Sequence, residues 1–134
     1  MTATDHPTVA DLEELTQILD SHPLDRAGLA TVLERIELGL HAHFEALGQR
    51  GGLLDESERV HRPSLAREED RLHEQLGYLV HDAEGLAQAA AGHADDEEEL
   101  RTHAAALLGA LRGFRDAEAH LVLDSAATEV GAGD

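Results

Sequence analysis

Cysteine, lysine and tryptophan are absent from this 134-residue sequence, and its aromatic side chains amount to one Tyr and two Phe. The absence of cysteine excludes a disulfide framework and any thiolate metal site. Because so few aromatic side chains are present, Leu and Ala must build the core, and this composition favours helices over sheets. The length predicts a single domain over residues 1–134 with room for a hydrophobic core.

Positive charge is also scarce, since ten Arg stand against 28 Asp and Glu and the formal net charge is -18. So acidic a chain would repel phosphates, which argues against nucleic acids and anionic membranes as partners. The opening residues MTATDHPTV have neither the basic nor the apolar region of a signal peptide, and no apolar run approaches membrane-spanning length. We therefore expect a cytoplasmic protein with no nucleic-acid partner and no membrane partner.

Common catalytic motifs are missing as well, because no Ser–His–acid arrangement, phosphate-binding glycine loop or nucleotide fingerprint is visible. Hydrolase, kinase and dehydrogenase functions have no support, no catalytic residue is predicted, and enzymatic activity is left open. Ten His, in contrast, are many for this length. Histidine is the commonest metal ligand and titrates near neutral pH, so the sequence raises two hypotheses, metal binding and a response to pH.

Apolar residues recur every three or four positions in four stretches and predict amphipathic helices over residues 8–20, 25–48, 63–91 and 95–128. Residues that start or stop helices stand at the expected ends: Thr8 with Asp11, Ser21–Pro23, Asp25, Gly51–Gly52, Pro63, Gly92, and Asp95 or Asp96. The segment from Leu53 to His61 is expected to be a crossing connection. Four such helices with short connections predict an all-α fold, an up-down-up-down four-helix bundle.

One histidine interrupts the apolar face of the second predicted helix, whose members are Leu29, Leu33, Ile36, Leu40, His43 and Leu47. The corresponding face of the fourth helix superposes on it with an offset of 71 residues, so that His43 matches Phe114 and Leu47 matches Glu118. Each helix thus carries half of an inward His–acid pair. A His and a carboxylate four residues apart share one face of a helix, and bundles present such pairs to interior metals.

Several short features occur in a familiar order: His43-Phe44, the turn Gly51–Leu54, the run Arg67–Asp70 before a leucine-rich face, and the closing EAHLVLDSAATEVGAGD. Over residues 12–134 the chain resembles the hemerythrin-like (HHE cation-binding) domains. The resemblance implies a four-helix bundle around a non-heme di-iron site made of histidines and bridging carboxylates. It also implies a role in binding or sensing oxygen, in iron storage, or in peroxide and nitric oxide chemistry.

The resemblance further implies metal ligands at positions 43, 47, 70, 114 and 118, and a histidine near residues 15–17. His43 and Glu118 match by type, whereas Leu47 and Phe114 carry no ligand atom. Asp70 can still ligate, and His73 can replace a missing imidazole. The predicted metal ligands are therefore His43, Asp70, His73 and Glu118, with Glu69, His41 and Glu45 as second choices, around mononuclear iron or an atypical di-iron pair, with dioxygen as a small ligand.

A metal-free alternative stands beside this prediction. His43 and Glu118 would then form a buried hydrogen-bonded pair, since a buried charge needs a partner with or without metal. Leu47 and Phe114 would keep the interior folded as apolar replacements for ligands. The chain would act as an interaction module, a small-ligand-binding module or a homodimer, and no cofactor would be bound.

Overall fold

The computed structural model describes residues 9–50, 54–92 and 96–132. Helices make up nearly all of these residues: α1 (Val9–Asp20), α2 (Arg26–Arg50), α3 (Glu56–His61), α4 (Pro63–Ala91) and α5 (Glu97–Ala132). The described residues contain no strand, and the predicted all-α class is confirmed. Among the described helices, none combines the length and apolar character needed to span a lipid bilayer.

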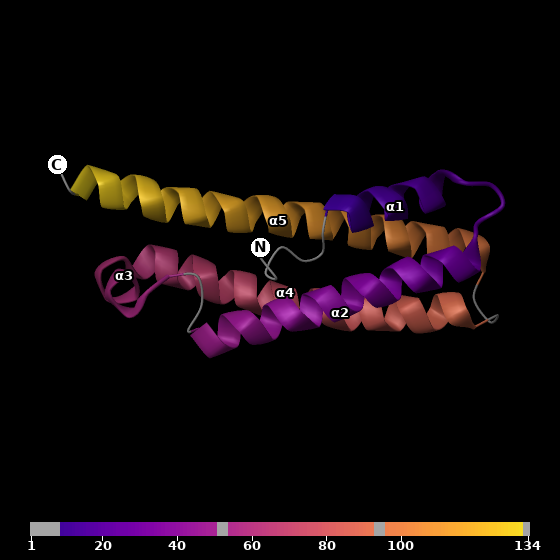
Figure 1. Cartoon of the computed structure of the whole chain (residues 1–134), viewed down its shortest axis with the longest axis horizontal. Helices are drawn as coiled ribbons and strands as arrows, with labels where there is room; N and C mark the ends of the chain where they lie inside the picture. The colour runs from indigo at the N-terminus through magenta and orange to yellow at the C-terminus, as the bar shows by residue number, and fades with distance from the viewer. Residues whose placement is uncertain (1–8, 51–53, 93–95, 133–134) are drawn as a thin grey trace.

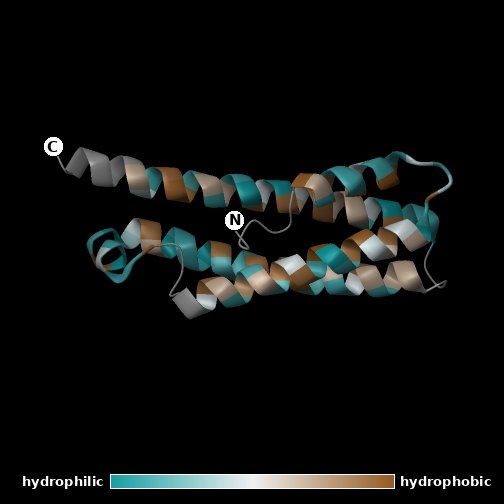
Figure 2. Ribbon diagram, in the orientation of Figure 1, coloured by the Kyte–Doolittle hydropathy of each residue, from teal (hydrophilic) through white to brown (hydrophobic). Residues whose placement is uncertain are grey.

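The four long helices lie side by side along the long axis of the molecule (Figure 1). Helix α1 packs against α2 and α5, α2 packs against α4, and α4 packs against α5, so each long helix has two long neighbours. The short helix α3 contacts α4 at the end of the molecule where α4 begins. Each long helix carries both hydrophilic and hydrophobic residues along its length (Figure 2), as expected of amphipathic helices.

Three of the residues that the sequence places at helix ends act there as predicted: Asp25, Pro63 and Gly92. The Asp25 carboxylate accepts the Gly28 backbone N–H at 3.0 Å and so caps α2. Pro63 stands in the first turn of α4, and the Gly92 N–H closes α4 on the Gln88 carbonyl at 3.1 Å. Thr8, Gly51–Gly52 and Asp95 lie outside the described residues.

The segment between the second and third predicted helices is expected from the sequence to be a connection without a helix, and this prediction is wrong because the segment contains α3. Asp55 begins this helix with a capping box: its carboxylate accepts the Glu58 N–H at 2.7 Å, and the Glu58 carboxylate accepts the Asp55 N–H at 3.4 Å. The signal was present in the sequence as an acidic residue followed three positions later by Glu. Six residues give too little periodicity to predict a helix without that cap.

The core consists almost entirely of leucine and alanine side chains, as the composition predicts. Leu29, Leu33, Ile36 and Leu40 of α2 are fully buried, and they pack with buried residues of the other three long helices. Burying one such side chain stabilises the fold by about 1.5–3 kcal/mol relative to leaving it in water. Phe114 of α5, with 1% of its surface exposed, is the largest buried side chain.

Candidate functional site

The interior histidine predicted from the sequence lies in the core, with only 3% of its surface exposed. The Nε2 atom of His43 on α2 is 2.6 Å from the Oε2 atom of Glu118 on α5. The Glu118 side chain is 21% exposed, so the pair runs from the core toward the surface. The structure thus brings together the two residues that match the hemerythrin-like ligand pattern by type.

Apolar side chains occupy two positions near this pair where the resemblance implies further ligands. The Phe114 ring meets the His43 ring edge to face, with centroids 6.2 Å apart and an interplanar angle of 83°. Leu47 is buried one turn beyond His43. The Nδ1 atom of His43 is buried and has no hydrogen-bond partner among the described residues. A proton on Nδ1 would therefore be an unpaired buried donor, which favours the tautomer whose Nε2–H donates to Glu118.

Asp70 does not join the interior pair, contrary to the sequence prediction. Its side chain is 67% exposed, and its Oδ1 atom accepts a hydrogen bond from Arg59 Nη2 at 2.8 Å. Neighbouring Glu69 is buried instead: it accepts the Leu54 backbone N–H at 2.8 Å and pairs with Arg59 Nη1. Arg59 stands on α3, the helix that the sequence analysis missed, and this is why both carboxylates turn toward that end.

The charge on Arg59 is secured by its two acidic partners. Hydrogen bonding to Asp70 raises the pKa of the Arg59 guanidinium, burial opposes the rise, and hydrogen bonding to Glu69 adds to it. Arg59 therefore stays charged under any ordinary condition. Glu69, a second choice as a metal ligand, is held by this arginine and by the Leu54 backbone amide.

His73 stacks on the ring of Phe44, with centroids 4.4 Å apart and an interplanar angle of 30°. It is half-buried between α4 and α2. Among the described residues, no three of His43, Asp70, His73 and Glu118 have ligand atoms within 4.8 Å of one another. The predicted four-ligand cluster is therefore not assembled, because Arg59 holds Asp70 and the Phe44 ring covers His73.

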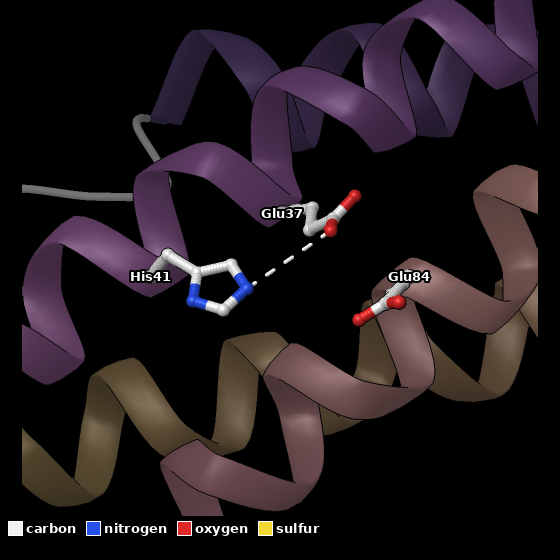
Figure 3. Close-up of side chains that lie close together, drawn as sticks. All are labelled: Glu37, His41 and Glu84. Carbon is white, nitrogen blue, oxygen red and sulfur yellow. Dashed lines mark ion pairs between the residues drawn. The ribbon is translucent and has the colours of Figure 1, made fainter.

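The other second-choice residues, His41 and Glu45, also lie apart from the interior pair. Glu45 is exposed, and the His41 side chain approaches Glu37 one turn earlier on α2, with its Nε2 atom 4.0 Å from Glu37 Oε1. Glu84 of α4 lies opposite, and the ligand atoms of Glu37, His41 and Glu84 are all within 4.8 Å of one another (Figure 3). The Glu37–His41 spacing was visible in the sequence, whereas the place of Glu84 depends on how α2 and α4 pack.

A groove of about 650 Å³ lies between α4 and α5. Its wall is mostly apolar, and three exposed polar side chains also line it. The lining residues are His81, Asp82, Gly85, Leu86, Ala89, His103, Ala106, Leu107 and Ala110. Small side chains on both helices open this space, and the sequence analysis did not predict it because the pairing of α4 with α5 sets its width.

The described residues thus contain three features that could serve a function: the interior His43–Glu118 pair, the Glu37–His41–Glu84 cluster and the α4–α5 groove. The arguments for function rest on these side chains. Comparisons with protein-family models, with curated proteins and with solved structures gave no match to this chain.

Proposed function

We propose that this chain is a hemerythrin-like, up-down-up-down four-helix bundle of α1, α2, α4 and α5 that folds without an interior iron centre and binds a small ligand. The observation that carries the proposal is the His43–Glu118 contact of 2.6 Å, with buried Leu47 one turn from His43 on α2 and buried Phe114 one turn from Glu118 on α5. The resemblance implies an iron centre at these positions, whereas His43 Nε2 and Glu118 Oε2 are occupied by their contact with each other, and the buried His43 Nδ1 has no hydrogen-bond partner among the described residues.

The interior donor set does not fit a di-iron centre. Its two ligand-type side chains already hydrogen-bond to each other, and Leu47 and Phe114 offer no ligand atom. Even a single structural zinc ion ordinarily takes four protein ligands, and a catalytic one takes three. An apolar core of similar volume is often at least as stable as a buried polar network, so this interior is a stable alternative to a metal centre. No oxygen, peroxide or nitric oxide chemistry is assigned to it.

The α4–α5 groove supports the ligand-binding part of the proposal. Its volume of about 650 Å³ lies within the range of small-molecule sites, roughly 300–1,000 Å³. Leu86, Leu107 and Ala110 give it an apolar wall, while His81 and His103 supply ring nitrogens for hydrogen bonds. The matching ligand is a small molecule with an apolar body and one polar end.

The interior is tested by anaerobic ferrous loading followed by exposure to air. We expect no absorption bands from oxo-bridged iron, because the pair cannot provide the ligands. The experiment is repeated in the Glu84→Gln variant, which lacks one carboxylate of the surface Glu37–His41–Glu84 cluster, so that iron bound at that cluster is not counted. Oxo-bridged bands at two irons per chain in both proteins would overturn the metal-free interior.

The groove is tested with the neutral apolar dye Nile red, whose fluorescence rises in apolar sites. A Cβ at Gly85 meets no atom within 4 Å, so Gly85→Leu should enter the groove without disturbing the fold. We expect this variant to bind the dye at least tenfold more weakly. Gly113→Leu is the matched control on α5, since its Cβ is equally free and it does not line the groove. Equal weakening by both variants would contradict the groove as the binding site.

A further inference from the structure

Three metal-ligand side chains converge between α2 and α4, on the surface of the molecule. Glu37 and His41 project from successive turns of α2, and Glu84 projects toward them from α4 (Figure 3). The set is mixed, with one imidazole nitrogen and two carboxylates, and it draws on two helices that share a long interface. It is separate from the His43–Glu118 pair and from the α4–α5 groove.

The spacing of these atoms is close to that of a coordination sphere. Their ligand atoms all lie within 4.8 Å of one another, and His41 Nε2 is 4.0 Å from Glu37 Oε1. Ligands at zinc bond lengths in a tetrahedral site are about 3.4 Å apart. Glu37 is the more fixed member, with 22% of its side chain exposed, whereas the His41 side chain is 49% exposed. Closing the remaining distance requires the side chains to rotate, and the exposed His41 side chain has solvent on one side.

The local charge also favours a cation. Two carboxylates approach each other across the helix interface, and among the described residues no arginine forms an ion pair with either of them. Their mutual repulsion is relieved when a divalent ion lies between them. The formal net charge of -18 adds a general attraction for cations.

We propose that Glu37, His41 and Glu84 form a binding site for a divalent transition-metal ion of the zinc type. The ion ties α2 to α4, and water fills its remaining coordination positions. The imidazole selects this class of ion, because calcium and magnesium prefer oxygen ligands throughout. This site does not depend on the proposed small-ligand function, and its failure would leave that function untouched.

The test is calorimetric titration of the untagged full-length chain with Zn²⁺ alone. We expect one ion per chain in the tightest binding event and a higher melting temperature with Zn²⁺, since a ligand of the folded state alone raises its stability. Glu84→Gln keeps the size of the side chain and removes a carboxylate ligand, so it should weaken that event at least tenfold and abolish the thermal shift. Excess Mg²⁺ should not compete.

Glu45→Gln is the matched control, because Glu45 is the other glutamate four residues from His41 and lies outside the cluster. Its Zn²⁺ affinity should equal that of the parent protein. A second measurement uses Co²⁺, whose visible spectrum is sensitive to nitrogen ligands. The spectrum of the Co²⁺-loaded His41→Gln variant should differ from that of the Co²⁺-loaded parent protein. The proposal is overturned if no one-to-one event is seen, or if Glu45→Gln and Glu84→Gln weaken it equally.

Discussion

His43 and Glu118 lie 75 residues apart in the sequence, and their side chains approach to 2.6 Å. This contact joins α2 to α5 across the core, although these two helices are not among the extensively packed pairs. The pair places a strongly polar interaction within a mainly apolar part of the described interior. Its energetics can be separated from those of the surrounding leucines by substitution.

Removing only one partner of this pair should be costly. Glu118→Leu leaves the buried Nε2–H of His43 without an acceptor, and we expect a loss of about 1–3 kcal/mol in the free energy of unfolding. The double variant His43→Leu with Glu118→Leu removes both polar groups, so its loss should be smaller than the sum of the losses in His43→Leu and Glu118→Leu. Urea denaturation of the parent protein, the two single variants and the double variant measures this difference. Strict additivity would mean that the pair is not coupled.

Arg59 should stabilise the end of the molecule where α3 meets α4. Arg59→Ala leaves the buried Glu69 carboxylate with the Leu54 amide as its remaining partner from this network, and we expect a loss of about 1–3 kcal/mol. Adding Glu69→Gln removes the buried charge and should restore part of that loss. If the double variant is less stable than Arg59→Ala, the cost does not arise from loss of the Arg59–Glu69 ion pair.

Because of these ion pairs, we expect the contribution of Arg59 to stability to stay nearly constant up to mildly alkaline pH. Hydrogen bonding raises the pKa of Arg59 in the folded state, so its contribution is complete below the unfolded-state value and is lost only as the pH rises through the folded-state value. Both values lie far above neutrality. The stability difference between the parent protein and Arg59→Ala should therefore be the same at pH 7 and pH 9. Thermal unfolding at both values measures it, and a narrowing of the difference at pH 9 would contradict the assignment.

Arg26 closes the last turn of α4 from the start of α2. Its Nη2 atom donates to the Ala89 carbonyl at 3.0 Å and to the Gly92 carbonyl at 2.6 Å, which lie at the end of α4. Arg26→Ala should cost about 1–2 kcal/mol, since hydrogen bonds to a charged group are worth more than neutral ones. Arg35→Ala is the comparison, because the exposed Arg35 side chain pairs with half-buried Asp11 and with Glu14 and its removal should cost less than about 1 kcal/mol. Chemical denaturation ranks the two variants, and the reverse order would contradict this assignment.

Two glycines should respond to alanine in opposite ways. Gly113→Ala places its methyl group in open space within α5 and should stabilise the protein by about 0.5–1 kcal/mol through helix propensity. At Gly28 the new methyl group would collide with the Asp25 carboxylate that caps α2. Gly28→Ala should therefore gain nothing or destabilise, as the cap is displaced. Melting temperatures of the two variants decide the matter, and equal gains would show that the cap adjusts freely.

The long helices, most of their ends and the inward direction of His43 could be predicted from the sequence because these properties are local. A helix repeats every 3.6 residues, so the spacing of apolar residues fixes which face is buried. A capping residue such as Asp25 acts within its own turn, so the start of its helix can also be predicted from the sequence. The pairing of His43 with Glu118 followed from placing both on buried faces.

Tertiary packing decided the rest, because the remaining contacts join residues whose relation no local period encodes. Asp70 and Glu69 are neighbours, and Arg59 on a six-residue helix determines where both carboxylates turn. Glu84 meets His41 only because α2 and α4 pack at one particular register. Ligand sets of this kind depend on how whole helices are rotated and shifted relative to one another. The apolar pattern does not determine these positions more finely than about one helical turn. The sequence therefore determined the helices and their buried faces, and the packing decided which polar side chains meet.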